Sequence, residues 1–341
     1  MKILVTGGTG YIGSHTVVEL INAGHNVLII DNLSNSEIGA IDKIEKMTGV
    51  RPDFYEFDLK DRQDTTAFLK EHSDLDAVIH FAASKSVVES VNKPFKYYRN
   101  NLNSLMNIVD CMAEHGIKNL VFSSSCTVYG QPEILPVTEQ SPILKADSPY
   151  GNSKQISEEI IQDAIRSGRD INAIALRYFN PIGAHESAEI GELPLGVPDN
   201  LVPFVTQTAA GVREQLSIFG SDYNTPDGTA VRDYIHVVDL AKAHVIAIER
   251  LVQNKSKAKY EIFNIGTGKG NSVLDIVNTF EKVTGLKLNY KIVGRRAGDI
   301  EKVWADTSLA NTELGWKAEK TLDDALLSAW NWEKNFRNIK S

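Results

Sequence analysis

The stretch TGGTGYIG (6–13) decides how this chain folds. It follows the apolar run ILV (3–5) and leads into 11–23, a segment of helical spacing that stops at Gly24. Glycine suits the left-handed conformation that ends many helices, so the stretch joins a predicted strand to a predicted helix. Three of its glycines, Gly7, Gly10 and Gly13, recur at every third position.

The glycine spacing has two interpretations. By itself it indicates a tight strand-to-helix turn and nothing more. Its context favours a phosphate site, because glycines let the backbone touch a pyrophosphate whose charge the helix N-terminus stabilises. The second predicted strand ends in Asp31, roughly 20 residues further on, where a carboxylate accepts the hydroxyls of an adenosine ribose. We therefore predict a dinucleotide-binding loop.

Asp31 also indicates which dinucleotide binds. Its carboxylate would repel the 2′-phosphate of NADP, and no arginine stands in 31–34 to neutralise that phosphate. NAD is therefore the expected cofactor, although Asn35 and Ser36 could still make neutral hydrogen bonds. Asp58, at the end of the third predicted strand, suits the adenine edge; a helix N-cap or a turn is an equally good role for it.

Short β-branched runs alternate with amphipathic segments up to Asn180. This alternation is typical of βαβ units, and strands buried on both faces indicate a parallel sheet. We expect strands at 3–7, 26–30, 54–58, 76–83, 119–125 and 171–179. We expect helices at 11–23, 61–72, 104–115 and 148–168, with Asp61 as the N-cap of the second. The predicted fold class is α/β, a Rossmann-type doubly wound parallel sheet.

The pattern changes after Asn180. Proline and glycine recur and periodicity fades, so 181–234 is expected to be a loop-rich region that covers a ligand. Strand and helix signals return at 233–251 and 260–268, and 320–336 is helical. We expect two interleaved parts: an NAD-binding domain of 1–180 plus about 235–265, and a smaller α/β substrate-binding cap of 181–234 plus about 266–341.

Composition narrows the function classes. The 341 residues include 36 Lys plus Arg and 44 Asp plus Glu, a formal charge of 36 − 44 = −8, which argues against binding to nucleic acid or an anionic membrane. The apolar runs fall far short of the ~20 residues of a membrane span, and the start MKILVTGG does not resemble a signal peptide, so we expect a cytoplasmic protein. The two cysteines, Cys111 and Cys126, lack metal-ligand spacing, and no metal site is expected.

Tyr150 and Lys154 lie four residues apart at the start of a predicted helix and therefore share a face. A free tyrosine has a pKa of about 10, but a lysine ammonium and a positive nicotinamide ring together would stabilise the phenolate. Such a phenolate can remove a hydroxyl proton while hydride leaves the same carbon. Ser125, ending the fifth predicted strand, would orient the reacting oxygen, whereas Ser123 and Ser124 are interpreted as structural. The alternative for the pair is two surface residues on an amphipathic helix.

Several motifs, taken together, resemble a known family. They are TGGTGYIG (6–13), DN (31–32), FAASKSV (81–87), SSSCTVYG (123–130), YGNSK (150–154), LRYFNPIGAH (176–185) and VRDYIHV (231–237). The combination resembles the extended short-chain dehydrogenase/reductase superfamily, and within it the UDP-glucose 4-epimerases, from residue 1 to about 330. The most specific parts are DNLSNS (31–36), RYFNPIGAH and the 296–299 region.

The resemblance implies a role for each matching residue. Tyr150 would be the acid/base, Lys154 would hold the nicotinamide ribose and tune Tyr150, and Ser125 would bind the sugar hydroxyl. The residues implied around NAD are Gly7, Gly10, Tyr11, Ile12, Gly13, Asp31, Asn32, Asn35, Ser36, Asp58, Leu59, Phe81, Ala82, Lys85, Asn100, Tyr150, Lys154 and Phe179. The residues implied around a UDP-sugar are Lys85, Ser125, Tyr150, Asn180, Asn200, Leu201, Ser217, Ile218, Phe219, Arg232, Arg296, Asp299 and Val303. The two arginines can pair with a diphosphate, though an arginine beside Asp233 is more often in a salt bridge.

The reaction implied by the resemblance is reversible C4 epimerisation of a UDP-hexose through a 4-keto intermediate with tightly bound NAD. It would serve galactose metabolism or the supply of surface-polysaccharide precursors. The alternative is a nucleotide-sugar 4,6-dehydratase or another epimerase of the same superfamily. The acid and base of a dehydratase would have to be Cys126 and Thr127, which protonate a leaving hydroxide poorly. A reductase of the superfamily would have no use for two diphosphate-binding arginines. A non-enzymatic nucleotide-binding scaffold is disfavoured because the serine, tyrosine and lysine are all intact.

Two further expectations concern the sugar and the assembly. Val303 falls where the family walls the hexose 2-position, often with a tyrosine, so the smaller valine predicts room for an N-acetyl group and use of UDP-GlcNAc/UDP-GalNAc. The segments 104–115 and 148–168 could form the seam of a homodimer, as the resemblance suggests. Packing of 104–115 into the core is an equally good explanation.

Overall fold

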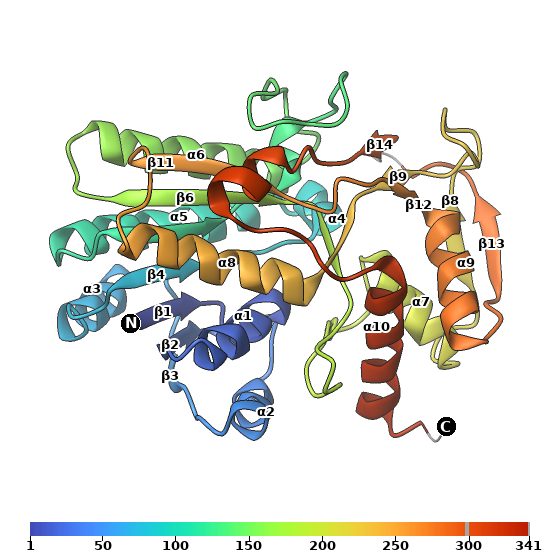
Figure 1. Cartoon of the computed structure of the whole chain (residues 1–341), viewed down its shortest axis with the longest axis horizontal. Coiled ribbons are helices and arrows are strands. Elements are labelled where there is room, and N and C mark those ends of the chain that lie inside the picture. Colours follow the sequence, from blue (N-terminus) through green and yellow to red (C-terminus); the bar gives the residue numbers. More distant parts are fainter. Residues whose placement is uncertain (297–299, 340–341) are drawn as a thin grey trace.

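A seven-stranded parallel sheet forms the larger part of the molecule (Figure 1). The computed structural model describes residues 1–296 and 300–339. The strands of this sheet are β1 Lys2–Thr6, β2 Asn26–Asp31, β3 Asp53–Glu56, β4 Ala77–His80, β5 Asn119–Ser123, β6 Asn172–Tyr178 and β11 Tyr260–Ile265. They lie in the order β11-β6-β5-β4-β1-β2-β3, and each neighbouring pair is parallel. The predicted doubly wound α/β fold is confirmed, and its connectivity reverses between β1 and β4.

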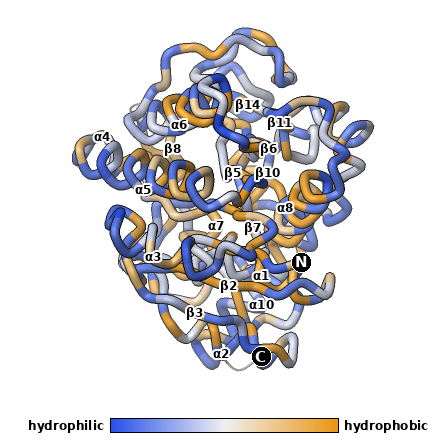
Figure 2. The backbone as a smooth tube through the Cα atoms, turned by 90° about the vertical axis from the view of Figure 1, so that its left-hand side faces the viewer, coloured by the Kyte–Doolittle hydropathy of each residue, from blue (hydrophilic) through white to orange (hydrophobic). Residues whose placement is uncertain are grey.

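Helices cover both faces of the sheet (Figure 1). One face packs against α1 Tyr11–Asn22, α2 Gly39–Thr48 and α8 Val237–Val252, and the other against α3 Arg62–Glu71, α5 Pro94–Glu114 and α6 Pro149–Arg166. Because side chains alternate along a strand, Ile3 and Val5 join the core under α1 and α8, whereas Leu4 joins the core under α5. Figure 2 shows the resulting concentration of apolar residues on the strands and their covering helices.

The predicted helix ends agree with the structure. Asp61 caps α3 by accepting hydrogen bonds from the backbone N–H groups of Gln63 and Asp64. Gly24 and Gly168 follow α1 and α6 with φ of 82° and 93°, the left-handed region that glycine enters without strain. These local signals set where the chain turns back toward the sheet.

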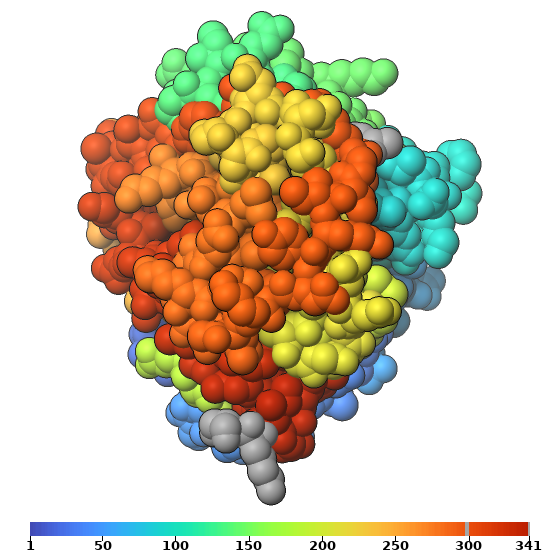
Figure 3. All heavy atoms as spheres, turned by 90° about the vertical axis from the view of Figure 1, so that its right-hand side faces the viewer, coloured from blue at the N-terminus to red at the C-terminus, as the bar shows by residue number. Residues whose placement is uncertain are grey.

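The rest of the chain builds three small sheets beside the large one. They pair β7 Asn180–Ile182 with β10 Tyr234–His236, β8 Leu216–Phe219 with β13 Tyr290–Val293, and β9 Val231–Arg232 with both β12 Asn271–Ser272 and β14 Lys302–Val303. Their helices are α7 Leu201–Ala209, α9 Val273–Thr284 and α10 Leu322–Arg337. Residues of α7, β8, α9 and α10 share a separate apolar core. Figure 3 shows these segments, yellow to red, covering one face of the molecule.

Some elements differ from the sequence-based prediction. The expected loop-rich region contains α7, which was not predicted because its proline and β-branched residues favour a helix poorly. The helix predicted at 104–115 begins at Pro94, and α2 and α4 Val87–Asn92 were not predicted. Leu105, Ile108 and Met112 of α5 are fully buried, so core packing explains these three apolar positions. The chain also contains two short helical turns, η1 Cys126–Tyr129 and η2 Ala310–Leu314.

Two absences hold for residues 1–296 and 300–339. No helix there combines the length and apolarity needed to cross a bilayer. No group of three or more His, Cys, Asp or Glu in the same ranges is arranged to hold a metal ion.

Candidate active site

The loops that follow the parallel strands meet at one edge of the sheet. Gly7 follows β1, and a Cβ added there would lie 2.9 Å from the backbone N of Ala82, which follows β4. The two loops therefore touch at the point where the sheet reverses its connectivity. In open α/β sheets this crevice is where ligands bind.

The glycine loop leaves room for a phosphate group. Gly7 has φ of 71°, and a Cβ on Gly13 would lie 2.1 Å from the carbonyl oxygen of Gly7, so neither position tolerates a side chain. Gly10 is the N-cap of α1, and no side chain caps this helix end. The first N–H groups of α1 and its dipole therefore point at the loop, as the pyrophosphate of a dinucleotide requires.

Asp31 lies between the glycine loop and the turn that follows β2. Its Oδ2 accepts a hydrogen bond from the backbone N of Thr9 at 3.3 Å, and its Oδ1 accepts from Leu33 N at 3.0 Å and Ser36 Oγ at 3.1 Å. These contacts fix the carboxylate beside the loop, where it can meet a ribose. The geometry of the loop and this carboxylate fits NAD.

Asp58 lies beside Asn32, whose Nδ2 donates to Asp58 Oδ2 at 3.2 Å. Asp58 Oδ1 also accepts from the backbone N of Lys60 at 2.9 Å. The N-cap of the following helix is Asp61, so the capping role considered for Asp58 is wrong and the turn-forming role holds. The prediction of Asp61 as the cap is thereby confirmed.

Tyr150 and Lys154 are both buried at the start of α6, with 7% and 4% of their surface exposed. The interpretation of the pair as surface residues is therefore wrong. Pro149 opens the helix, and Ser148 caps it by accepting from Gly151 N at 3.1 Å. Lys154 Nζ donates to the carbonyl oxygen of Ser123 at 2.6 Å and lies 5.9 Å from the centre of the Tyr150 ring.

The electrostatics around Tyr150 keep its phenol protonated. Burial raises the pKa of Tyr150 and nearby Tyr178 raises it further, while the hydroxyl of Ser125 acts in the opposite direction. Burial lowers the pKa of Lys154 to about 8, and the carboxylate of Glu158 partly offsets that effect. Loss of the Tyr150 proton therefore requires a further positive charge close to the ring.

Hydrogen bonds to neighbouring side chains hold the first two serines at the end of β5. Ser123 Oγ lies 2.8 Å from Tyr178 Oη, and Ser124 Oγ donates to Glu158 Oε1 at 2.5 Å. These contacts confirm the structural roles expected for both serines. Ser125 Oγ accepts from the backbone N and the hydroxyl of Thr127, at 3.2 and 2.9 Å.

Arg232 and Asp233 do not form the salt bridge considered as an alternative. Arg232 Nη1 donates to the carbonyl oxygen of Val231 at 2.9 Å. Asp233 is fully buried and accepts from the backbone N of Thr267 at 2.8 Å and of Gly268 at 3.0 Å. The Arg232 guanidinium is close enough to the Cys126 thiol to lower that group's pKa, although burial, the larger effect, raises it to about 12. Arg232 thus belongs to the Ser125 side of the crevice.

The cap brings a second arginine onto an aromatic ring. The guanidinium carbon of Arg296 lies 5.6 Å from the centre of the Phe219 ring, and Phe219 leaves 40% of its surface exposed. Phe219 ends β8, which also contains Ser217 and Ile218. Asp299, the remaining predicted residue of this region, lies outside the described residues.

Comparison with known proteins assigns the family. The NAD dependent epimerase/dehydratase family matches residues 3–266. The chain belongs to this family. It is 49% identical to the UDP-glucose 4-epimerase of Bacillus subtilis, covering 100% of this chain and 99% of that one.

Solved structures of family members superpose on the whole chain. One is a UDP-glucose 4-epimerase from Stenotrophomonas maltophila with bound NAD and formylated UDP-arabinopyranose, with 45% identity, a TM-score of 0.95 and 100% coverage of both chains. Another is the enzyme from Bifidobacterium longum in complex with NAD+ and UDP, with 45% identity, a TM-score of 0.94 and 99% coverage of both chains.

Within this family fold, some predicted site residues are covered by apolar neighbours. Leu59, Ile218 and Val303 are 4%, 1% and 3% exposed, each in a hydrophobic cluster. Phe179 shares the cluster of Val303 and is equally buried. For these residues, backbone atoms or a small exposed edge are what a ligand could touch. Leu201 and Asn180 each begin an element, α7 and β7, and Asn180 N donates to Asp233 O at 2.9 Å.

Other predicted residues lie around the cofactor loop. Tyr11, Ile12 and Gly13 form the first turn of α1, and Phe81 lies against His244 with their ring centres 4.6 Å apart. Asn100 Nδ2 donates to Asn101 Oδ1 at 3.2 Å. Asn35 lies in the turn held by Asp31.

Sequence reasoning missed several polar residues that hold the site together. Asn101 Oδ1 accepts from Ser84 N at 2.8 Å and so fixes the loop after β4. Glu192 Oε1 accepts from Lys85 Nζ at 2.9 Å and from Asn200 Nδ2 at 2.6 Å. Glu158 lies one helical turn after Lys154, and this spacing could have indicated Glu158 as a buried partner of the lysine.

Proposed function

We propose that this chain catalyses the reversible C4 epimerisation of UDP-hexoses, UDP-glucose and UDP-galactose, with tightly bound NAD. The observation that carries this proposal is the burial of Tyr150 and Lys154 beside Ser125, at the sheet edge that also carries the glycine loop. Full-length identity of 49% to a UDP-glucose 4-epimerase supports the same reaction. Galactose metabolism is the corresponding pathway.

The mechanism assigns proton transfer to the protein. Once the positive charge of bound NAD has favoured its phenolate, Tyr150 Oη would take the proton of the C4 hydroxyl as C4 is oxidised to a ketone, and would return that proton when the ketone is reduced. Ser125 Oγ holds the reacting oxygen, and the buried ammonium of Lys154 favours the phenolate. When bound, NAD supplies a nicotinamide ring that accepts a hydride from C4 and gives it back.

Inversion requires that the sugar turn over between the two hydride transfers. The protein can permit this if it holds the nucleotide firmly and the sugar loosely. Arg232 and Arg296 would bind the diphosphate, and the uracil would stack against the exposed ring of Phe219. The sugar would then pivot about its link to the fixed diphosphate.

The dehydratase alternative conflicts with the chemistry beside Ser125. Burial raises the pKa of Cys126 to about 12, so its thiol is a weak proton donor and its thiolate is scarce at neutral pH. The hydroxyl of Thr127 donates to Ser125 Oγ and is engaged there. Neither side chain supplies the acid that elimination of water needs. A scaffold without chemistry would not need Lys154, whose burial is costly.

The sugar preference rests on Val303. A tyrosine would add a large ring next to Phe179, whereas the smaller valine would leave more room there for a ligand. We therefore include UDP-GlcNAc and UDP-GalNAc among the proposed substrates. The division into an NAD-binding domain and an interleaved cap is proposed with the boundaries given above, and a cytoplasmic location remains a prediction.

The second proposed partner is another copy of this chain. Exposed apolar side chains gather on α4 and α5, where Val91, Phe95 and Met106 are 60%, 73% and 43% exposed. A homodimer would cover them. Light scattering of the purified protein measures the assembly, and Phe95→Glu is expected to shift it toward monomer.

The activity test is a spectrum together with product analysis. Purified protein is expected to retain NAD through gel filtration, to gain reduced-nicotinamide absorbance with a UDP-sugar, and to interconvert the C4 epimers. Tyr150→Phe is expected to lower turnover by about 10²–10⁴ without loss of the folded state. Full turnover by that variant would refute the mechanism, and a dehydrated product would favour the dehydratase.

A further inference from the structure

Glu192 joins two residues that belong to opposite walls of the proposed site. Lys85 lies in the loop after β4 on the cofactor side, and Asn200 is the N-cap of α7 in the cap. Both donate to the same oxygen, Glu192 Oε1, at 2.9 and 2.6 Å. Nothing else in the proposed mechanism uses Glu192.

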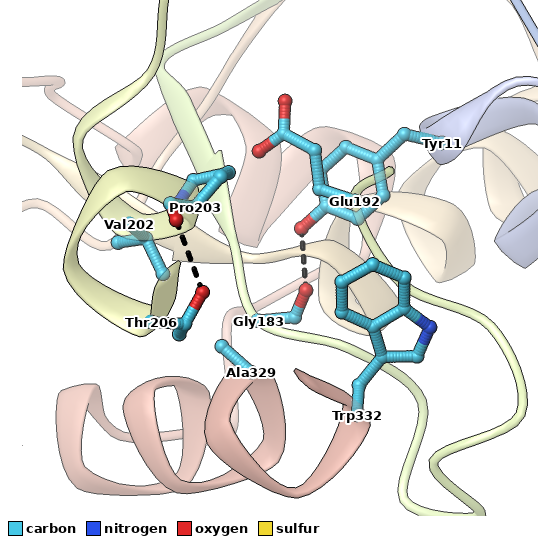
Figure 4. Close-up of a pocket in the computed structure, with 8 residues that line it drawn as sticks. All are labelled: Tyr11, Gly183, Glu192, Val202, Pro203, Thr206, Ala329 and Trp332. Atoms are coloured by element: carbon cyan, nitrogen blue, oxygen red, sulfur yellow. Dashed lines mark hydrogen bonds between the residues drawn. The ribbon is translucent and has the colours of Figure 1, made fainter. Parts of the chain in front are cut away.

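The position of Glu192 is fixed by its neighbours. A Cβ added to Gly191 would lie 2.5 Å from the indole of Trp332, so the backbone there packs directly on α10. Tyr11 Oη donates to Gly183 O at 2.6 Å on the other side of the same junction. In Figure 4 the Glu192 carboxylate points away from Trp332 and Ala329.

The burial of Glu192 makes these contacts matter. Its side chain is 10% exposed, whereas that of Lys85 is 46% exposed and lies 5.7 Å over the Tyr11 ring. A buried carboxylate needs its donors, because an unpaired buried charge is costly. The hydrogen bonds to Glu192 therefore hold the side chains of Lys85 and Asn200 in place, although free side chains of these types sample several rotamers. Glu192 lines the pocket drawn in Figure 4, and the residues that line this pocket do not include Ser125, Tyr150 or Lys154.

We propose that Glu192 is a positioning residue that acts through Lys85 and Asn200, holding the cofactor-side wall and the cap-side wall at the separation that a bound UDP-sugar spans. The inference rests on the proposed function, since it takes Lys85 and Asn200 as ligand-binding residues. Glu192 itself makes no contact with the reacting atoms. It affects binding of the sugar nucleotide more than the chemical step.

The test compares Glu192→Gln with the wild-type holoenzyme. The amide keeps the size of the side chain but removes the charge that both donors share. We expect the Kd of UDP, measured by calorimetry on NAD-loaded protein, and the KM of UDP-glucose each to rise about tenfold, as expected for loss of a charge-assisted hydrogen bond. We expect kcat to stay within about threefold, because the chemical step is not touched.

A double-mutant cycle separates positioning from a merely structural role. If Glu192 acts through Asn200, the effects of Glu192→Gln and Asn200→Ala on the Kd of UDP combine to less than their product. Multiplicative effects would overturn the proposal. A Kd within twofold of wild type for Glu192→Gln would overturn it as well.

Two controls keep the outcome interpretable. Glu189→Gln removes a carboxylate three residues away that pairs with Lys46 at 2.6 Å, and it is expected to leave the Kd of UDP unchanged. If Glu192→Gln does not fold, Glu192→Asp provides the same test, because the shorter side chain keeps the charge but cannot reach both donors. Wild-type protein that binds UDP but does not epimerise UDP-glucose would refute the proposed function and leave this inference to be judged by the UDP measurements.

Discussion

Replacing Arg177 by methionine is expected to destabilise the protein and slow turnover together. Arg177 and Glu158 are 4% and 5% exposed, and Arg177 donates from Nε to Glu158 Oε1 at 2.9 Å and from Nη2 to Glu158 Oε2 at 2.6 Å. Arg177→Met removes both of these donors and leaves the Glu158 carboxylate with the hydrogen bond from the Ser124 hydroxyl. Removing one partner of such a pair costs about 3–5 kcal/mol.

The assay is thermal unfolding of the NAD-loaded protein. At about 2 °C per kcal/mol for a chain of this length, Tm is expected to fall by roughly 6–10 °C. The double variant Glu158→Gln/Arg177→Met removes both charges, so most of the loss is expected to be recovered. The kcat of Arg177→Met is also expected to fall, because Ser124 connects Glu158 to the backbone that carries Ser125.

A matched pair elsewhere in the fold controls for general destabilisation. Arg250 makes the same two-point contact with Glu261, at 2.8 and 2.9 Å, with side chains 10% and 11% exposed. Arg250→Met is expected to lower Tm without changing kcat. A loss of less than 2 °C in Arg177→Met, or a double variant as unstable as the two single changes combined, would refute the reasoning.

Three further predictions follow from the site. Burial lowers the pKa of Lys154 to about 8, so the side chain loses its charge as the pH rises through that value. Turnover is therefore expected to fall at alkaline pH in a pH–rate profile. In a Lys154→Arg protein that stays active, this fall should occur at higher pH, because guanidinium does not titrate there. Asp31→Asn removes the charge beside the ribose; NAD retention through gel filtration is expected to drop and discrimination against NADP to weaken, and unchanged retention would contradict the ribose assignment. Val303→Tyr is expected to suppress turnover of UDP-GlcNAc and spare UDP-glucose in parallel kinetic assays; equal effects on both sugars would contradict the assigned wall.

The parts of the site that could be predicted from the sequence depend on short spacings. The glycine loop and Asp31 follow from one strand-turn-helix unit and the strand after it, and Tyr150 and Lys154 from one turn of a helix. Local geometry fixes such arrangements wherever the chain folds as βαβ units. The resemblance to the family then extended them to residues of the cap.

The parts that could not be predicted depend on contacts between distant segments. Glu192 meets Lys85 across 107 residues, and Phe219 meets Arg296 through pairing of β8 with β13. Helix α7 was missed because its proline and β-branched residues favour a helix poorly, and the core that it shares with β8, α9 and α10 stabilises it. In each case a tertiary contact decides the outcome, and no local spacing encodes it.

The buried carboxylate of Asp233 has a consequence for how new sugar preferences can arise. It accepts from the backbone N of Ala305 at 3.2 Å, two residues beyond Val303, as well as from the loop after β11. The main chain under position 303 is therefore anchored independently of the side chain it carries. If Val303 walls the sugar as proposed, exchange of that single side chain is expected to change the accepted sugar while these backbone contacts keep the main chain in place.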